Sequence, residues 1–249
     1  SAASDVYKRQ PMDRELSEML QAEYAKRGIK FYLSHKVTGV HGTEVSVEKD
    51  GETFTLHGDK VLLSVGRRPV TKGFGLETLA PETFRNGVKV NEYMQTSLPN
   101  VYACGDITGF SLLAHTAIRE AEVAINHILG IDDWMDYDCV PGVVYTNPEI
   151  AGVGETEESA STKGINYQVI KLPMAYSGRF VAENEGVNGV CKVLLDEQQR
   201  VIGAHVLGNP ASEIITLAGT AIELGLTAAQ WKKIVFPHPT VGEIFREAL

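Results

Sequence analysis

Apolar and polar positions near the start of the chain recur with a helical period. Leu16 and Leu20 lie on one face of a predicted helix, which begins after Asp13, a suitable N-cap, and ends at Gly28. Glycine is typical of a helix end because it has no Cβ to oppose the left-handed conformation there. We therefore expect an amphipathic helix over residues 14–27.

The next segment changes to the period of two that is typical of strands. A short strand is expected over 29–33, and extended backbone over 36–40. Apolar residues then alternate with polar ones on both sides of Asp50-Gly51, a dipeptide that favours a two-residue turn. The pattern predicts an antiparallel hairpin.

A continuous apolar run over 61–65 has no polar residue at alternate positions. Such a run is expected for a strand that is buried on both faces of a parallel sheet. It ends at Gly66, and ligands of open α/β sheets bind beyond the carboxyl ends of the strands. Gly66 is therefore a candidate for close approach to a cofactor, although a glycine also fits where a strand simply turns.

Another buried strand and a long helix are predicted farther along. Small and apolar residues predict the strand over 101–104, and a shorter strand is expected over 88–91. The helix is expected to begin at Leu112 and to end at Gly130. Its apolar residues are spaced for burial on one face: Ala114, Ile118, Ala121, Ile125 and Ile128.

From residue 137 onward, strands are grouped apart from helices, which indicates an α+β layer. Strands are expected over 143–146, 150–153, 167–172, 190–195 and 201–207. Helices are expected from Thr156 to Gly164, over 211–224, after Thr227 and over 241–249. This arrangement predicts an antiparallel sheet with one face covered.

Composition and charge exclude several kinds of partner. The 249 residues carry a net charge of −9, which argues against nucleic acid or an anionic membrane surface as the main partner. No apolar run approaches the ~20 residues that span a bilayer, and we expect no membrane partner and no signal peptide. Cys104, Cys139 and Cys191 are isolated, as expected of reduced thiols in the cytoplasm and not of a disulfide scaffold, and we expect no metal site. Residues 1–10 lack periodicity, and we expect them to be a non-native leader.

The candidate chemistry near the C-terminus centres on His238, which lies between Pro237 and Pro239. The prolines restrict the backbone, and Thr240 begins a helix in which Glu243 completes a capping box. The imidazole is thus expected on a rigid arm with a carboxylate one turn away, which is the arrangement that a general base needs. Alternatively, His238 is an ordinary loop residue and Glu243 only satisfies the Thr240 amide.

A second group of candidate residues follows the predicted strand over 101–104. Gly105 permits close backbone approach, and Asp106 can accept hydrogen bonds from the hydroxyls of a polyol. The helix start at Leu112 offers backbone amides and the positive end of a helix dipole to an electron-rich carbonyl. Asp106 alone could be an ordinary loop residue, but the combined pattern favours a binding site.

Several motifs occur together in an order that is similar to a known family. They are Val65-Gly66-Arg67-Arg68-Pro69, residues 96–106, Leu112 to His115, Val144 to Glu149, and His238-Pro239-Thr240 with Glu243. As a set they resemble the flavin- and nicotinamide-dependent disulfide reductases, the class I pyridine nucleotide-disulfide oxidoreductases, and within them the dihydrolipoamide dehydrogenase branch. The resemblance runs from about Pro11 to the end of the chain.

The resemblance implies a fold class and a division into domains. The chain would contain α/β remnants of Rossmann-like NAD- and FAD-binding domains, followed by an α+β interface domain with an antiparallel sheet. Residues 11–71 would end the NAD-binding domain, 72–136 would return to the FAD-binding domain, and 137–249 would form the dimerisation domain of a homodimer.

The resemblance also implies cofactor contacts with FAD and NAD. Asp106, next to Gly105, would bind the ribityl chain of FAD. The backbone of four residues would face the flavin ring: Leu112, Leu113, Ala114 and His115. Gly66 would lie at the nicotinamide cofactor, and Val37 would line its adenosine side.

The activity that the resemblance implies is the oxidation of dihydrolipoamide to lipoamide with NAD⁺, through FAD and a redox disulfide. His238, oriented by Glu243, would take a proton from dihydrolipoamide and act across the dimer interface on the partner's disulfide. The substrate would be carried by the lipoyl domain of a 2-oxoacid dehydrogenase complex or of the glycine cleavage system.

Two features of the family are missing from this sequence. It contains neither a pair of cysteines spaced C-x-x-x-x-C nor a G-x-G-x-x-G loop. We therefore expect the chain to be the C-terminal part of such an enzyme and to be inactive alone. A related glutathione- or mercuric-type reductase, or a cofactor-free dimerisation module, remains an alternative.

Overall fold

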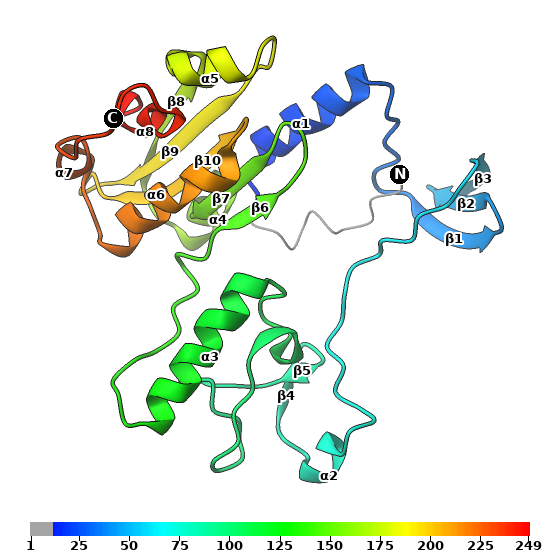
Figure 1. Cartoon of the computed structure of the whole chain (residues 1–249). Helices are drawn as coiled ribbons and strands as arrows, with labels where there is room; N and C mark the ends of the chain where they lie inside the picture. The colour runs from blue at the N-terminus through cyan, green and yellow to red at the C-terminus, as the bar shows by residue number, and fades with distance from the viewer. Residues whose placement is uncertain (1–11) are drawn as a thin grey trace. The chain divides into compact units, whose positions relative to one another are not determined.

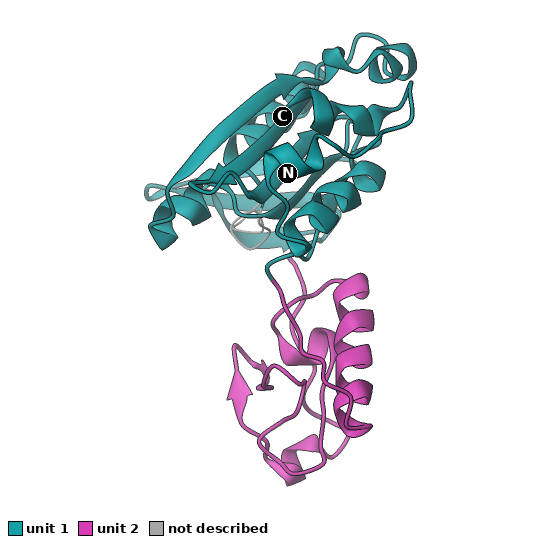
Figure 2. Cartoon of the chain, turned by 90° about the vertical axis from the view of Figure 1, so that its left-hand side faces the viewer, with its two compact units in different colours: residues 1–65, 138–249 teal, residues 66–137 magenta. Residues whose placement is uncertain are grey.

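The computed structural model describes residues 12–249 and divides into two compact units (Figures 1 and 2). The large unit combines the described part of residues 1–65 with residues 138–249, and the small unit comprises residues 66–137. The expected leader, residues 1–10, lies outside the described residues. The domain limits expected from the sequence remain predictions.

A five-stranded sheet forms the centre of the large unit, with the strand order β6-β7-β10-β9-β8. The strands are β6 (Gly142–Val144), β7 (Ile150–Gly154), β8 (Tyr167–Pro173), β9 (Val190–Asp196) and β10 (Val201–Leu207). Every neighbouring pair is antiparallel. The antiparallel sheet predicted for the second half of the chain is therefore confirmed.

Both faces of this sheet are buried, whereas the sequence predicted that only one is covered. Alternate residues of β7, β9 and β10 face a core that they share with α6 (Ala211–Glu223) and α8 (Ile244–Glu247). On the other face, Val190 and Leu207 pack with Leu16 and Leu20 of α1 (Arg14–Lys26). The second cover comes from a helix far earlier in the sequence, so the period of the strands could not reveal it.

Short helices complete this part of the large unit. They are α4 (Glu157–Lys163), η3 (Met174–Tyr176), α5 (Gly178–Glu183), α7 (Ala228–Trp231) and η4 (Val241–Glu243). Thr156 caps α4 and Gly164 ends it in the left-handed region, as expected. The helix predicted after Thr227 ends at Trp231, whose ring stacks on Phe245 with 5.3 Å between centroids.

The predicted hairpin is confirmed as part of a second, three-stranded antiparallel sheet. Its strands are β1 (Lys36–His41), β2 (Glu44–Lys49) and β3 (Glu52–His57), in the order β1-β2-β3. Asp50 and Gly51 both adopt positive φ, 53° and 85°, as a two-residue hairpin turn requires. Residues 29–33 form no strand, contrary to the prediction, and the extended stretch over 36–40 is part of β1.

The run over 61–65 is not a buried strand, contrary to the prediction. Leu62 is 91% exposed, and Leu63 and Val65 are also exposed. A strand that is buried on both faces needs neighbours to take up its backbone hydrogen bonds. None of the three sheets formed by residues 12–249 includes this run, so it stays extended and open.

The small unit is built from short elements around one long helix. They are α2 (Leu76–Leu79), β4 (Thr83–Phe84), β5 (Gly87–Val88), η2 (Gly105–Thr108) and α3 (Ala114–Ile128). The strand expected over 101–104 is reduced to an isolated bridge between Gln95 and Tyr102. With few strand partners in this unit, turns and side-chain hydrogen bonds hold the segment.

The long helix of the small unit buries a different face from the one predicted. Thr116, Glu120 and Val123 are buried, whereas Ile118, Ile125 and Ile128 are exposed. The helical period was predicted correctly. Within the small unit, however, α3 packs through its partly polar face, and the isoleucine stripe has no cover.

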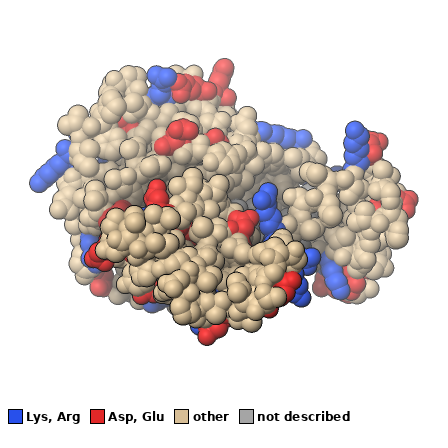
Figure 3. Space-filling model, turned by 60° about the horizontal axis from the view of Figure 1, so that its bottom comes forward, with Lys and Arg blue, Asp and Glu red and all other residues tan. Residues whose placement is uncertain are grey.

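None of the helices in residues 12–249 has the length and apolar character to cross a bilayer. These residues also hold no cluster of three or more His, Cys, Asp or Glu suited to a metal ion. On the face drawn in Figure 3, Lys and Arg side chains are interspersed with Asp and Glu among other residues.

Candidate functional site

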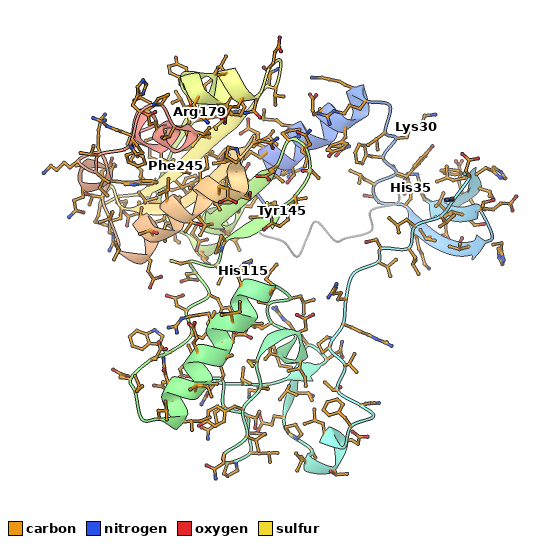
Figure 4. The ribbon with its side chains drawn as sticks, in the orientation of Figure 1. Lys30, His35, His115, Tyr145, Arg179 and Phe245 are labelled. Carbon is orange, nitrogen blue, oxygen red and sulfur yellow. The ribbon has the colours of Figure 1, made fainter. Side chains whose placement is uncertain are left out.

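A tight turn after the last two prolines positions Glu243. The backbone N–H of Thr240 donates to Glu243 Oε2 at 2.7 Å, so this carboxylate closes the first turn of η4. Behind the turn, Phe245 is buried against Trp231 and is labelled in Figure 4. The hydroxyl of Ser177 also donates to the Thr240 carbonyl at 3.2 Å. The turn is therefore anchored in the core of the large unit.

The same carboxylate holds the imidazole of His238. His238 Nδ1 lies 2.9 Å from Oε1 and 3.2 Å from Oε2 of Glu243. The imidazole side chain is 81% exposed, whereas that of Glu243 is only 17% exposed. The Thr240 amide, and then the His238 ring, hold the pKa of Glu243 below its usual value, so the carboxylate stays charged. Glu243 thus makes both contacts that the sequence suggested.

A histidine that binds a carboxylate through Nδ1 can act as a base at Nε2. When Nδ1–H of the neutral ring donates to Glu243, the lone pair is on Nε2. The exposure of His238 leaves its ring open to a substrate. A carboxylate at Nδ1 also stabilises the imidazolium that forms when Nε2 takes a proton. The pair is therefore a candidate acid–base group, and its catalytic role remains a prediction.

A sharp turn in the small unit presents the carboxylate of Asp106. Gly105 adopts a φ of 79°, in the left-handed region that favours glycine, and its N–H donates to Glu120. The Asp106 side chain is 48% exposed, and its Oδ2 lies 3.9 Å from Nη1 of Arg67. An exposed carboxylate in this position suits hydrogen bonds from hydroxyl groups.

The start of α3, which contacts η2, supplies backbone donors. Its N-cap residue Leu113 makes no side-chain cap hydrogen bond, and Leu112, Ala114 and His115 are exposed; His115 is labelled in Figure 4. An uncapped helix start offers N–H groups and a positive dipole end to an acceptor. An exposed carboxylate and such a helix start suit the ribityl hydroxyls and the ring carbonyls of FAD, so these residues fit that cofactor.

The two positions expected near the nicotinamide cofactor lie in different units. Gly66, in the small unit, is exposed with a φ of 91°, and its neighbour Arg67 pairs with Asp106. Val37 lies in β1 of the large unit, opposite Val47 of β2, and is also exposed. Both positions are accessible to a ligand, and their role in binding a nucleotide remains a prediction.

Two residues that the sequence did not single out complete the Gly105 turn. Glu120 is buried; its Oε2 accepts from the Gly105 amide at 2.5 Å and its Oε1 accepts from the Tyr137 hydroxyl at 2.7 Å. Burial raises the pKa of Glu120, and burial together with the Glu120 carboxylate raises the pKa of Tyr137. The available signal was helical spacing, because Thr116, Glu120 and Val123 share the buried face of α3.

Two family models match the chain. The model described as pyridine nucleotide-disulphide oxidoreductase matches residues 1–126. The model for the dimerisation domain of the same family matches residues 140–249, which contain the five-stranded sheet and the His238–Glu243 pair.

Known relatives are similar over almost the whole chain. It is 40% identical over 245 residues to the mitochondrial dihydrolipoyl dehydrogenase of Caenorhabditis elegans, covering 95% of this chain and 49% of the relative. It is 39% identical over 246 residues to that of Homo sapiens, covering 95% of this chain and 48% of the relative. The chain therefore spans about half the length of the curated relatives it matches.

Solved structures agree with this similarity. LpdA from Mycobacterium tuberculosis matches with a TM-score of 0.85 at 27% identity, covering 95% of this chain and 52% of that chain. The HOCl-induced flavoprotein disulfide reductase RclA from Escherichia coli matches with a TM-score of 0.81 at 25% identity, covering 96% of this chain and 55% of that chain. As its motifs predicted, the chain belongs to the pyridine nucleotide-disulphide oxidoreductase family.

Proposed function

We propose that the chain is the C-terminal part of a dihydrolipoyl dehydrogenase, which oxidises dihydrolipoamide to lipoamide with NAD⁺ through FAD and a redox disulfide. The observation that carries the proposal is the exposed imidazole of His238, with Nδ1 held 2.9 Å from Glu243. The identities of 40% and 39% to the enzymes of C. elegans and H. sapiens support this branch of the family.

In the proposed reaction, His238 moves a proton for sulfur chemistry. A free thiol has a pKa of roughly 8.5, so most dihydrolipoamide is protonated at neutral pH and cannot attack a disulfide. His238 Nε2 takes the thiol proton, the thiolate bonds to one disulfide sulfur, and the other sulfur leaves with the electron pair of the broken S–S bond. Glu243 stabilises the imidazolium of His238 until Nε2 gives up this proton again. FAD supplies, when bound, the route by which the electrons reach NAD⁺.

The proposal extends to cofactors, partners and location. The exposed Asp106 carboxylate and the uncapped start of α3 support FAD, and the dimerisation-domain match supports a homodimer. In that dimer His238 would act on the disulfide of the partner subunit. The proposed substrate carrier is the lipoyl domain of a 2-oxoacid dehydrogenase complex or of the glycine cleavage system. A cytoplasmic location is proposed from the sparse, isolated cysteines.

Replacing the base in the full-length protein tests the proposal. His238→Gln keeps a polar side chain but cannot take the thiol proton. Since general base catalysis contributes about 100-fold or more, stopped-flow reduction of the flavin by dihydrolipoamide should slow by about that factor, with FAD content unchanged. An unchanged rate would remove His238 from the mechanism.

The chain contains a matched control for this experiment. His57 also pairs with a glutamate, with Nδ1 3.4 Å from Glu44 Oε1 and a side chain that is 70% exposed. His57→Gln should leave the rate unchanged, because this pair lies in the three-stranded sheet and has no assigned role. If the wild-type protein reduced oxidised glutathione rapidly and did not oxidise dihydrolipoamide, the proposed function would be wrong and a glutathione-type reductase activity would be assigned instead.

A further inference from the structure

The side chain of Glu120 is completely buried. It has no part in the proposed proton transfer. A buried polar group is costly unless it is hydrogen-bonded. Both oxygens of Glu120 have such partners: Oε2 accepts from the Gly105 N–H at 2.5 Å and Oε1 accepts from the Tyr137 hydroxyl at 2.7 Å. The side chain thus ties the residue before Asp106 to the middle of α3.

The rest of the turn is fixed by its own hydrogen bonds and by β5. Thr108 Oγ1 donates to the Gly105 carbonyl at 3.0 Å, and the Gly109 N–H donates to the Asp106 carbonyl at 3.1 Å. A Cβ at Gly87 of β5 would lie 2.3 Å from the Thr108 carbonyl oxygen, so the two backbones are in direct contact. With this backbone held, the Asp106 side chain is the part of the turn that remains exposed.

The two contacts of Glu120 depend on the length of its side chain and not on its negative charge. Each oxygen makes one contact, so a protonated carboxyl or an amide could accept from Gly105 and donate to the hydroxyl oxygen of Tyr137. Burial, with a smaller contribution from the charge of Asp106, raises the pKa of Glu120, whereas the hydrogen bonds from Gly105 and Tyr137 lower it without reversing the shift. An aspartate would keep the charge, but it is one methylene shorter and would not reach Gly105.

We infer that Glu120 is a positioning residue for FAD, which fixes the Gly105 backbone so that the exposed carboxylate of Asp106 is presented to the ribityl hydroxyls. The inference rests on the proposed function, because it takes Asp106 as a ligand of the ribityl chain. Glu120 acts through the Gly105–Asp106 turn, since its own oxygens are engaged by Gly105 and Tyr137.

The affinity of the full-length apoprotein for FAD tests the inference, measured by quenching of flavin fluorescence. E120Q should bind FAD within about twofold of the wild type, because its amide preserves both contacts. E120D should bind about tenfold more weakly, which is the upper range of the effect of losing one ordinary hydrogen bond. Glu122 lies on the same helix with an exposed side chain, so E122Q is a matched control and should bind like the wild type.

The melting temperatures of the four apoproteins separate positioning from a purely structural role. If E120D melts earlier but binds FAD as tightly as the wild type, the inference is wrong. It is also wrong if E120Q binds more weakly than E120D, since the charge would then matter more than the reach. Should E120D fail to fold, a tenfold loss in E120Q still contradicts the inference and wild-type affinity supports it. Failure of the wild-type apoprotein to bind FAD would refute the proposed function instead.

Discussion

Side chains that follow local rules could be predicted from the sequence, and those that depend on the tertiary fold could not. His238, Thr240 and Glu243 lie close together in the sequence, and the capping geometry brings the carboxylate back to both partners. Glu120 instead meets Gly105 and Tyr137, which are 15 and 17 positions away in the sequence. The sequence pattern around Glu120 does not predict these two contacts.

Lys192 is a second buried ionisable side chain whose partners lie far away in the sequence. It lies in β9, and its Nζ contacts Asp13 Oδ2 at 2.9 Å, Glu15 Oε2 at 2.9 Å and Glu157 Oε1 at 2.6 Å. Burial alone would lower the pKa of Lys192, but hydrogen bonds to Glu157, Asp13 and Glu15 outweigh it and leave the pKa above its usual value. The amine therefore stays charged inside the protein and links α1 to the sheet.

Removing this amine should destabilise the protein. Lys192→Met leaves the buried carboxylate of Asp13 without its cation, and breaking a buried pair in this way costs about 3–5 kcal/mol. The double variant Lys192→Met/Asp13→Asn should recover part of the loss, because an amide at position 13 is uncharged and can still accept from the Leu16 N–H. Urea denaturation would measure both, and equal stability of the single variant and the wild type would contradict the assignment.

Helices and strands were predictable where one period dominates, but their packing was not. The sequence predicted strands β9 and β10, whereas the docking of α1 on their second face depends on residues far apart in the sequence. The period of α3 was correct and its buried face was wrong. Two faces of that helix carry apolar residues, and only the tertiary contacts of Glu120 and Val123 decide between them.

Acid should weaken the attachment of α1. Hydrogen bonds to Lys171 and then Lys192 hold the pKa of Glu15 below the usual glutamate value of 4.5. Because the folded pKa lies below the unfolded one, this contribution is complete above pH 4.5 and is lost as the pH falls through the folded value. The melting temperature should therefore decrease as the pH is lowered below 4.5, and Glu15→Gln should make this decrease less steep.

A neighbouring glutamate on the same helix provides the comparison for this measurement. Glu18 pairs with the exposed Arg14 at 3.1 Å, and Glu18→Gln should leave the acid profile close to that of the wild type. Superimposable profiles for Glu15→Gln and the wild type would show that Glu15 does not control the acid sensitivity of α1.

Among residues 12–249, two apolar segments that the sequence suggested were buried are exposed. They are the run over 61–65 and the α3 stripe formed by Ile118, Ile125 and Ile128. The fold class could be predicted because the motifs of the chain resemble those of a known family. The same resemblance implied that these segments lie inside a larger structure. The chain spans about half of its relatives, with 49% and 48% of their lengths covered, and each unit by itself offers these residues no partner surface.

The 249-residue chain purified alone should therefore be colourless and should bind a hydrophobic dye such as ANS. Ile118→Gln combined with Ile125→Gln should reduce dye fluorescence, because both side chains are exposed in the small unit. The full-length protein should bind less dye per mole. Recovery of the 249-residue chain with stoichiometric yellow flavin would contradict this expectation.

The shared use of Glu243 by the Thr240 amide and the His238 ring couples reactivity to local order. Fraying of the first turn of η4 would release the imidazole from Glu243 and make it inactive as a base without altering any atom of the ring. Hydrogen exchange at the Thr240 amide would then report, from the backbone, how much of the population is competent to accept a proton.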